Sequence, residues 1–447
     1  MPDKRKNLLY SCLIILAAFT VYLGYFVPRE ETISLMVGVG LMFAAFFIVL
    51  RKTEDEEVDL MYYWSILLRV LLIASIPKLS DDVYRFIWDG RLLVNLQDPY
   101  KYLPAHYLSE GIEGIDYSLF ELLNSSSYYS VYPPLNQVFF FLSTLLSPNS
   151  IGWSIVILRV LLFVFELGNI RLIRELLAHY NLPEKYGLLY ALNPLVIFEL
   201  TGNLHFEGVL VFFLLLAILK YEEGKLHTSA IYFGLSVATK FIPLILLPLL
   251  FRKIGFKKTM VYGLIVAATV AITFLPLINT AHIWAIWDSA ELYFQKFEFN
   301  GSFYYLARWY GFETEGHNII AKSGIWMMIA TFVTIMAYAL LGKKADWPRQ
   351  MVWVFLLYLL FATTVHPWYV IPMLAVSVFS TKRFPVFWSA LIFLTYINYM
   401  GGAYTDRIDV VLIEYGLLLV FLIFDLFGNT WNRLLLNSHQ VRREELP

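Results

Sequence analysis

Long runs of apolar residues recur from one end of this chain to the other, and they restrict its fold more than any other feature. Of the 447 residues, 59% are hydrophobic and only 15% are charged, whereas a soluble domain carries roughly a quarter charged residues. Apolar windows of roughly 15 to 20 residues form helices that cross a ~30 Å hydrocarbon core. The sequence therefore predicts an all-α polytopic membrane protein with about 12–14 transmembrane helices.

The apolar segments differ in length, and three of them are unusually short. A first helix from about Leu8 to Phe26 is expected to be retained, because it is too long for a signal-peptide core. Segments 186–200, 242–251 and 367–379 are too short for straight spans, so we expect them to dip into the membrane, to pair with each other, or to lie in a locally thinned region beside a cavity. The full set of expected spans is 8–27, 33–50, 60–79, 151–173, 186–200, 205–220, 227–240, 242–251, 259–278, 319–341, 350–365, 367–379, 385–400 and 410–427.

Lysine and arginine residues give the expected orientation. They gather in alternate loops, and the positive-inside rule places those loops in the cytoplasm. We therefore expect one integral-membrane domain over residues 1–447, in the cell (inner) membrane, with both termini cytoplasmic. Two aromatic loops, 80–150 and 279–318, then face outward. The apolar segment 135–146 is expected to lie in the outer interface, because a span there would reverse every later basic loop.

Charged residues crowd into the start of the first outer loop. Three carboxylates and two guanidinium groups fall within eleven residues, namely Asp81, Asp82, Arg85, Asp89 and Arg91. Charge is costly beside lipid, so such a cluster is more often a site than decoration. A carboxylate there can deprotonate a hydroxyl group while arginines hold a phosphate. The alternative is a helix cap or a solvated turn, although Asp82, Arg85 and Asp89 share one face at helical spacing.

Further polar residues are expected on the same outer face. They are Tyr132, Asn203, His205, Glu207, Lys240 and His366. Lys240 stands alone between apolar stretches, where it either snorkels to lipid headgroups or binds a phosphate. His205 and Glu207 begin a helix close to Glu199 and Asn203, and they form either a site or structural hydrogen bonds. A metal site of His205, Glu207 and the aspartates is conceivable, but the spacing matches no ligand motif, so we assign no metal or cofactor.

Other residues limit the possible functions. The net charge of −1 gives no sign of nucleic-acid binding, and the single Cys12 allows no disulfide within the chain. Arg159 and Glu166 lie seven residues apart in one span, and we expect them to form a structural ion pair outside the site. The aromatic residues of the two outer loops form either an interfacial belt or a platform on which sugar rings stack.

In their order along the chain, these motifs resemble those of the GT-C glycosyltransferases. The similarity in the first outer loop lies in Asp82-Val83-Tyr84-Arg85, Trp88-Asp89-Gly90, Asp98-Pro99-Tyr100 and Tyr132-Pro133-Pro134. Later blocks of similarity are Asn193-Pro194, Glu199, Asn203-Leu204-His205-Phe206-Glu207, Thr239-Lys240 and His366-Pro367-Trp368-Tyr369. The chain looks most like bacterial polyprenyl-phosphate-mannose-dependent mannosyltransferases and, more distantly, like GPI mannosyltransferase I.

The resemblance implies a GT-C-type fold and inverting transfer of a hexose, mannose before others. The donor would be a polyprenyl-phosphate-linked sugar, and the acceptor a glycolipid or glycan on the extracytoplasmic face. Asp82 would be the general base, assisted by Asp81, and one base suffices because a polyprenyl phosphate leaves without protonation. The donor phosphate would be bound by Arg85, Lys240 and Arg91. The remaining residues would position the sugar and acceptor, namely Asp89, Tyr132, Asn203, His205, Glu207 and His366.

Three alternatives stay open at this point. A transporter or flippase of lipid-linked sugars would share the lipid-facing groove, but it usually carries internal repeats, and none is visible here. A polysaccharide polymerase or ligase would use a diphosphate-linked donor. A membrane scaffold would leave the charge clusters unexplained.

Overall fold

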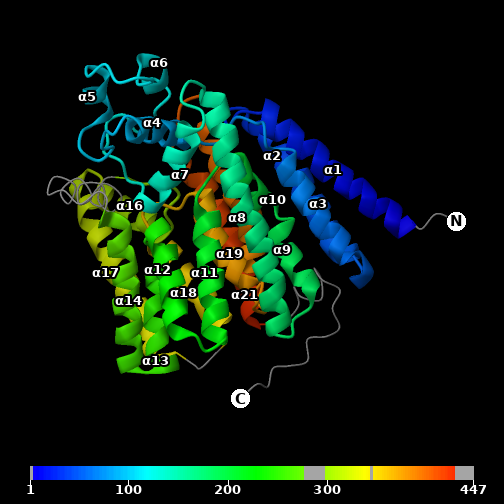
Figure 1. The fold of residues 1–447 in the computed structure, drawn as a ribbon. Coiled ribbons are helices and arrows are strands. Elements are labelled where there is room, and N and C mark those ends of the chain that lie inside the picture. Colours follow the sequence, from blue (N-terminus) through cyan, green and yellow to red (C-terminus); the bar gives the residue numbers. More distant parts are fainter. Residues whose placement is uncertain (1–3, 276–296, 343–345, 428–447) are drawn as a thin grey trace.

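The computed structural model describes residues 4–275, 297–342 and 346–427, which form a bundle of apolar helices (Figure 1). Apart from one isolated bridge between Phe299 and Thr364, these described residues hold no β-structure. The predicted all-α membrane fold is therefore confirmed. The longer helices of the bundle are α1 (Lys4–Phe26), α2 (Thr32–Lys52), α3 (Val58–Val70), α8 (Ile151–His179), α11 (Glu207–Glu222), α12 (Leu226–Thr239), α14 (Phe256–Phe274), α17 (Ile320–Leu341), α18 (Trp347–Phe361) and α21 (Ile408–Phe427).

Five of the described helices, α1, α2, α8, α14 and α17, are each long and apolar enough to cross a membrane. A sixth crossing is possible where the segment 194–202 and α11 join end to end at an angle of 113°. Shorter apolar helices occupy the expected spans in the C-terminal part of the chain. The expected span 60–79 is helical only as far as Val70, where turns lead into Pro77.

The segments that looked too short to cross are broken helices in the interior. Most side chains of the first of them, residues 186–202, are buried by neighbouring helices. Asn193 caps the turn before Pro194 by accepting a 2.9 Å hydrogen bond from the Leu195 amide. Irregular backbone is tolerated at membrane depth where protein covers it. The three segments contain η2 (Glu184–Gly187), α9 (Leu188–Ala191), α10 (Pro194–Val196) and the π-helix η3 (Ile197–Gly202), then η4 (Ile242–Leu249) and α13 (Leu250–Ile254), and finally η6 (Pro367–Val370) and α19 (Ile371–Ser377). The expected span 385–400 consists of α20 (Phe384–Leu391) and η7 (Ile392–Tyr399), and the short turn η1 (Asp55–Glu57), which has no buried residue, lies between α2 and α3.

A cap of short helices covers one end of the bundle, at the top of Figure 1. It contains α4 (Asp82–Val94), α5 (Pro104–Leu108), α6 (Tyr117–Phe120) and α7 (Pro134–Leu145). The segment expected to be interfacial is α7, and it packs along α4. The two helices approach so closely that a Cβ atom at Gly90 would lie 2.4 Å from the Phe140 carbonyl oxygen. The helix α16 (Phe303–Glu315) precedes α17.

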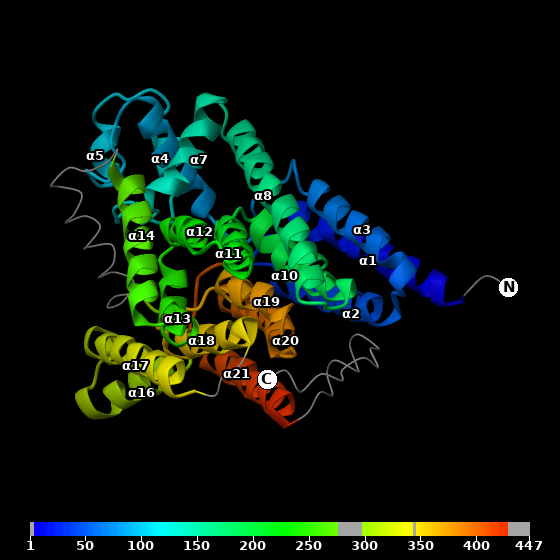
Figure 2. The same ribbon diagram turned by 60° about the horizontal axis from the view of Figure 1, so that its bottom comes forward.

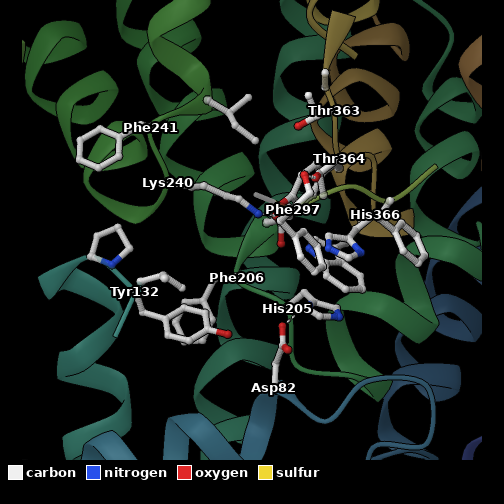
Figure 3. Close-up of a pocket in the computed structure, with 18 of the residues that line it drawn as sticks. Asp82, Tyr132, His205, Phe206, Lys240, Phe241, Phe297, Thr363, Thr364 and His366 are labelled. Carbon is white, nitrogen blue, oxygen red and sulfur yellow. Dashed lines mark hydrogen bonds and ion pairs between the residues drawn. The ribbon is translucent and has the colours of Figure 1, made fainter. Parts of the chain in front are cut away.

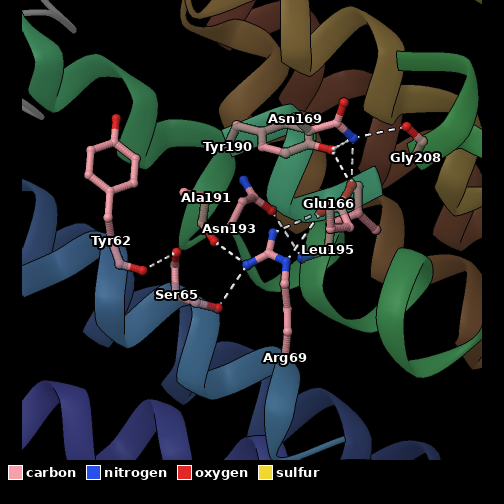
Figure 4. Close-up of polar contacts among 10 residues, drawn as sticks. All are labelled: Tyr62, Ser65, Arg69, Glu166, Asn169, Tyr190, Ala191, Asn193, Leu195 and Gly208. Carbon is pink, nitrogen blue, oxygen red and sulfur yellow. Dashed lines mark hydrogen bonds and ion pairs between the residues drawn. The ribbon is translucent and has the colours of Figure 1, made fainter. Parts of the chain in front are cut away.

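The predicted ion pair between Arg159 and Glu166 is wrong. Glu166 instead accepts hydrogen bonds from Arg69, whose Nη2 lies 3.1 Å from Glu166 Oε2 (Figure 4). Arg159 donates to the backbone oxygens of Thr201 and Gly202 at 2.8 and 3.1 Å. Where a helix ends, its last carbonyl groups lack partners, and a buried guanidinium group can supply them. The break after η3 thus determines the partner of Arg159, and sequence spacing along α8 does not show that break.

Candidate active site

A cavity of about 900 Å³ lies where the cap meets the bundle. It collects residues that are far apart in the sequence, from α4, the loop before α7, the start of α11, the end of α12, and the segment that joins α18 to η6 (Figure 3). Eight of the eleven predicted site residues line it, namely Asp81, Asp82, Arg85, Tyr132, His205, Glu207, Lys240 and His366.

The two adjacent aspartates have different partners. Asp81 Oδ2 lies 2.5 Å from Nη2 of Arg29, which comes from the turn between α1 and α2. Asp82 opens α4, and its Oδ1 accepts a 2.7 Å hydrogen bond from the Asn124 amide. The other oxygen of Asp82 lies 4.0 Å from His205 Nδ1 and makes no ion pair with a described lysine or arginine. Asp82 is therefore the carboxylate with a free oxygen and no cationic neutraliser.

Four aromatic rings form a continuous stack beside Asp82. The His205 and Trp368 ring centroids are 3.5 Å apart, with an interplanar angle of 18°. His366 is parallel to Trp368 within 6° at 4.5 Å, and Phe299 stacks on His366 at 4.5 Å. Desolvation by these surroundings, with Lys240 and His205 near, lowers the pKa of His366 well below the usual 6.5. The two histidines cover the indole of Trp368, so a sugar ring cannot stack on it.

Lys240 supplies positive charge to the cavity. It ends α12 in an extended conformation, and its amine nitrogen lies 2.5 Å from Oε1 of Glu207. The amine also lies 3.9 Å from the ring centroid of Tyr369. In Figure 3 its amine points toward the middle of the group of side chains. Because Lys240 keeps about 30% of its side chain exposed, it can contact a bound anion as well as Glu207.

Arg85 lines the cavity, but its guanidinium group forms hydrogen bonds to other residues of the cap. Its Nε donates to Asp89 at 2.8 Å, and Nη1 donates to the carbonyl groups of Ser125 and Tyr128 at 3.1 and 2.9 Å. Asp89 is fully buried and also accepts from Gln137. The one-face spacing of these residues on α4 is confirmed, but the pair holds the 125–128 loop in place, and Asp89 does not line the cavity.

Two further predicted site residues lie outside the cavity lining. Arg91 is buried in the cap and donates to the Gly114 carbonyl at 2.7 Å. Asn203 donates to Glu199 at 3.1 Å and accepts from the Leu79 amide at 3.3 Å. Both side chains make hydrogen bonds within the fold and lie away from the cavity lining, and their roles in substrate binding stay predictions.

Two charged residues, one on the cavity wall and one behind it, were not assigned to the site from the sequence. Arg29 lies on the cavity wall and packs on Tyr399, with its central carbon 4.7 Å from the ring centroid. In the sequence, its place in a charged turn between the first two spans was the one feature that could have indicated a role in the site. Glu199 is fully buried behind the cavity, where it lies 3.3 Å from His205 Nε2 and accepts a 2.7 Å hydrogen bond from Tyr396. In the sequence, Glu199 stood out as a neighbour of His205 and as one of the blocks that resemble the family, but it was not assigned to the site.

The far side of the cavity is apolar. Its walls come from η4, the end of α14, the middle of α17 and the end of α18. Several of these side chains are also exposed, among them Met328 at 48% and Phe332 at 65%, and the helix α17 from which they come buries few of its residues. The apolar residues include Phe241, Leu244, Ile245, Phe274, Met327, Met328, Phe332, Ile335 and Phe361. One cavity thus joins a charged part to a part continuous with the lipid-facing surface.

Only some of the loop aromatic residues reach the cavity. From the first loop, Tyr100, Tyr128, Tyr129 and Tyr132 line it. Residues 279–296 of the second loop lie outside the described residues. From the described part of this loop, Phe297 and Phe299 line the cavity. Within the described residues, no group of three or more His, Cys, Asp or Glu is arranged to hold a metal ion.

Comparison with known families adds evidence of a different kind. Residues 18–254, just over half of the chain, match the family model described as alpha-(1->6)-mannopyranosyltransferase, N-terminal domain. The matched region includes both aspartates, the His205 turn and Lys240, and it stops before α14. No curated protein matches the chain.

Proposed function

The chain belongs to the alpha-(1->6)-mannopyranosyltransferase family and is a mannose-transferring glycosyltransferase, and from this premise we propose its donor, its chemistry and its orientation. The proposed donor is a polyprenyl-phosphate-linked mannose, and the proposed acceptor is a hydroxyl group of a glycolipid or glycan. The transfer takes place on the extracytoplasmic face and inverts the configuration at the anomeric carbon.

The shape and lining of the 900 Å³ cavity carry this proposal. A polyprenyl-phosphate sugar has a long apolar chain, one anionic phosphate and a polar sugar. The cavity offers an apolar side open toward lipid, a cationic amine at Lys240, and a polar side with Asp82. This arrangement suits a lipid headgroup that enters from the membrane while its chain stays among the apolar walls.

Asp82 is proposed as the general base. The acceptor hydroxyl group attacks the anomeric carbon of mannose as Asp82 takes its proton, and the bond from that carbon to the phosphate oxygen breaks. The electron pair leaves with the polyprenyl phosphate, which needs no acid because its phosphate is already a good leaving group. A single displacement of this kind produces inversion.

The other cavity residues fit supporting roles. Lys240 is placed to stabilise the charge that develops on the departing phosphate, while Glu207 holds the amine in position. Arg29 neutralises Asp81 and so limits repulsion between the two aspartates. Tyr132 and the Tyr128–Tyr129 pair offer hydroxyl groups and ring surfaces to the sugars. His205 and His366, fixed by Trp368, offer imidazole nitrogens beside the reacting groups.

The proposed orientation places the cap outside the cytoplasm. Basic residues at the helix ends away from the cap, such as Arg51-Lys52 and Lys257-Lys258, favour the cytoplasmic side. The first residues of α1 and the last residues of α21 also lie toward that end in Figure 1. We infer that both termini are cytoplasmic and that the cavity opens on the opposite face of the cell (inner) membrane.

One experiment tests the proposal directly. Purified protein in detergent is given polyprenyl-phosphate mannose and a lipid extract, and products are followed by mass spectrometry. We expect a hexose-sized gain on an acceptor and the release of polyprenyl phosphate. Mannose transfer only from a nucleotide or diphosphate-linked donor would overturn the proposed donor. Movement of the donor across a vesicle membrane without transfer would favour the flippase instead.

A further inference from the structure

A second cavity, of about 590 Å³, lies at the end of the bundle opposite the cap. It forms where the turn between α11 and α12 meets the first turn of α14, low in Figure 1. Four basic side chains line it, namely Lys225, His227, Lys257 and Lys258. None of them belongs to the candidate active site.

The charge in this cavity is poorly balanced. Lys225 lies 2.7 Å from Glu223, and Lys220 pairs with the same carboxylate at 2.7 Å. Lys257 and Lys258 make no ion pair with any carboxylate among the described residues. Glu223 is thus the one carboxylate paired with these lysines among the described residues, so the cavity carries excess positive charge and would attract an added anion.

The position of the two unpaired lysines is locally unfavourable. Both lie in the first turn of α14, which contains no acidic residue. The partial positive charge of a helix N-terminus favours acidic side chains there and opposes basic ones. A sequence that breaks such a local rule without a compensating contact often does so at a functional site. An anion bound in the cavity would compensate both the lysines and the helix end.

The surroundings indicate that this anion belongs to a lipid. Val261 lines the cavity and is 48% exposed. Met260 and Leu264 are exposed on α14 as well, whereas only Thr259, Tyr262 and Val266 of this helix are buried. The basic cavity thus borders an apolar helix surface that faces acyl chains.

We propose that this cavity binds the phosphate headgroup of an anionic phospholipid, in the leaflet opposite the candidate active site. The headgroup lies between Lys225, His227, Lys257 and Lys258, and the acyl chains lie along α14. Basic pockets between helices on the cytoplasmic side of membrane proteins suit such headgroups.

Native mass spectrometry of the full chain tests this site. Protein in neutral detergent is mixed with phosphatidylglycerol or phosphatidylcholine, and the bound fraction is measured. The test variant is Lys257→Ala/Lys258→Ala. The matched control is Arg51→Ala/Lys52→Ala, which removes two exposed charges from the end of α2, also away from the cap, without touching the cavity. His227→Ala gives a separate test of the same cavity.

We expect wild-type protein to retain phosphatidylglycerol in preference to phosphatidylcholine. Each lysine near a lipid phosphate contributes roughly a fivefold change in affinity, so the double variant should weaken binding about 10- to 30-fold. The control should change it by less than about twofold. Melting without lipid should match wild type, because both lysines are exposed.

Three results would overturn the proposal. Equal retention of both lipids by wild-type protein would show that binding does not depend on an anionic headgroup. Equal losses in the two double variants would point to diffuse surface charge. Displacement of the lipid by inorganic phosphate at equal concentration would show that the acyl chains contribute nothing, and the site would then be one for free phosphate.

Discussion

The guanidinium group of Arg29 lies 2.5 Å from the carboxylate of Asp81, and this ion pair makes the two adjacent aspartates of the cavity unequal. Asp82 is left with a hydrogen bond from Asn124 and an oxygen that faces His205 at 4.0 Å. Because Arg29 already holds the carboxylate of Asp81 while one oxygen of Asp82 has no lysine or arginine partner among the described residues, the geometry favours Asp82 as the group that takes the proton.

Asp82→Asn should abolish mannose transfer and leave the protein folded. Removing a general base lowers the rate by roughly 10²–10⁴-fold, and the side-chain oxygen of asparagine can still accept from Asn124. The check is the rate of product formation from polyprenyl-phosphate mannose, with gel filtration and melting temperature to confirm folding.

Asp81→Asn is the matched control for this substitution. It should lower the rate less, by about tenfold, because Asp81 acts through its pair with Arg29. If both Asp82→Asn and the double variant Asp81→Asn/Asp82→Asn transferred mannose at close to the wild-type rate, the proposed mechanism would be contradicted.

Lys240→Gln should weaken use of the donor. A hydrogen bond to a charged group contributes about 1.5–3 kcal/mol, so kcat/KM for the donor should fall by roughly 10- to 100-fold. Lys240→Arg should restore part of the loss because it keeps the charge. Unchanged kcat/KM in Lys240→Gln would show that the phosphate is bound elsewhere.

Arg85→Gln should destabilise the cap. Removing one partner of a buried ion pair leaves Asp89 uncompensated and costs about 3–5 kcal/mol. The double variant Arg85→Gln/Asp89→Asn should be more stable than the sum of the single losses predicts, because it removes both charges. Melting temperatures of the three variants measure this. A wild-type melting temperature with a raised donor KM in Arg85→Gln would instead support the original phosphate-binding prediction.

Met328→Asp should impair long-chain donors selectively. Met328 lines the apolar side of the cavity, and a carboxylate there opposes a bound polyprenyl chain. Its neighbour Ile329 has a similar exposure, 43% against 48%, but does not line the cavity, so Ile329→Asp is the matched control. We expect KM to rise about tenfold or more for a long-chain donor in Met328→Asp, with little change for a short-chain analogue. Equal effects in both variants would exclude this path for the chain.

His366→Phe should reduce the acid sensitivity of the protein. The pKa of His366 is lowered in the folded state, so below pH 6.5 the unfolded chain binds a proton that the folded chain does not. The free energy of unfolding therefore falls as the pH drops below 6.5, by at most about 1.4 kcal/mol per pH unit from this group. Phenylalanine keeps a ring in the stack and removes the proton. Melting temperatures at pH 7.5 and 5.5 should differ less in the variant than in wild type, and an equal difference would show that His366 protonates freely.

Much of the architecture was predictable from the apolar pattern. Most of the expected spans coincide with helices because burial of an apolar helix in lipid is a local property of about 20 residues. The exceptions are the span 60–79, whose helix ends at Val70, and the three short segments, which are broken. The positions of Asp82, His205, Lys240 and His366 at the ends of those spans followed from the same pattern. Their convergence on one cavity was a hypothesis, and the tertiary structure shows it for eight of eleven residues.

The sequence by itself determined that this is a helical membrane protein of a mannosyltransferase type with acidic and basic residues at its helix ends. Only the tertiary structure decided which charge meets which. Arg29 comes from another turn to meet Asp81, and Arg69 takes the Glu166 that Arg159 was expected to hold. The reason is physical: lipid burial depends on composition along one segment, whereas an ion pair depends on a few ångströms between segments that the sequence does not place.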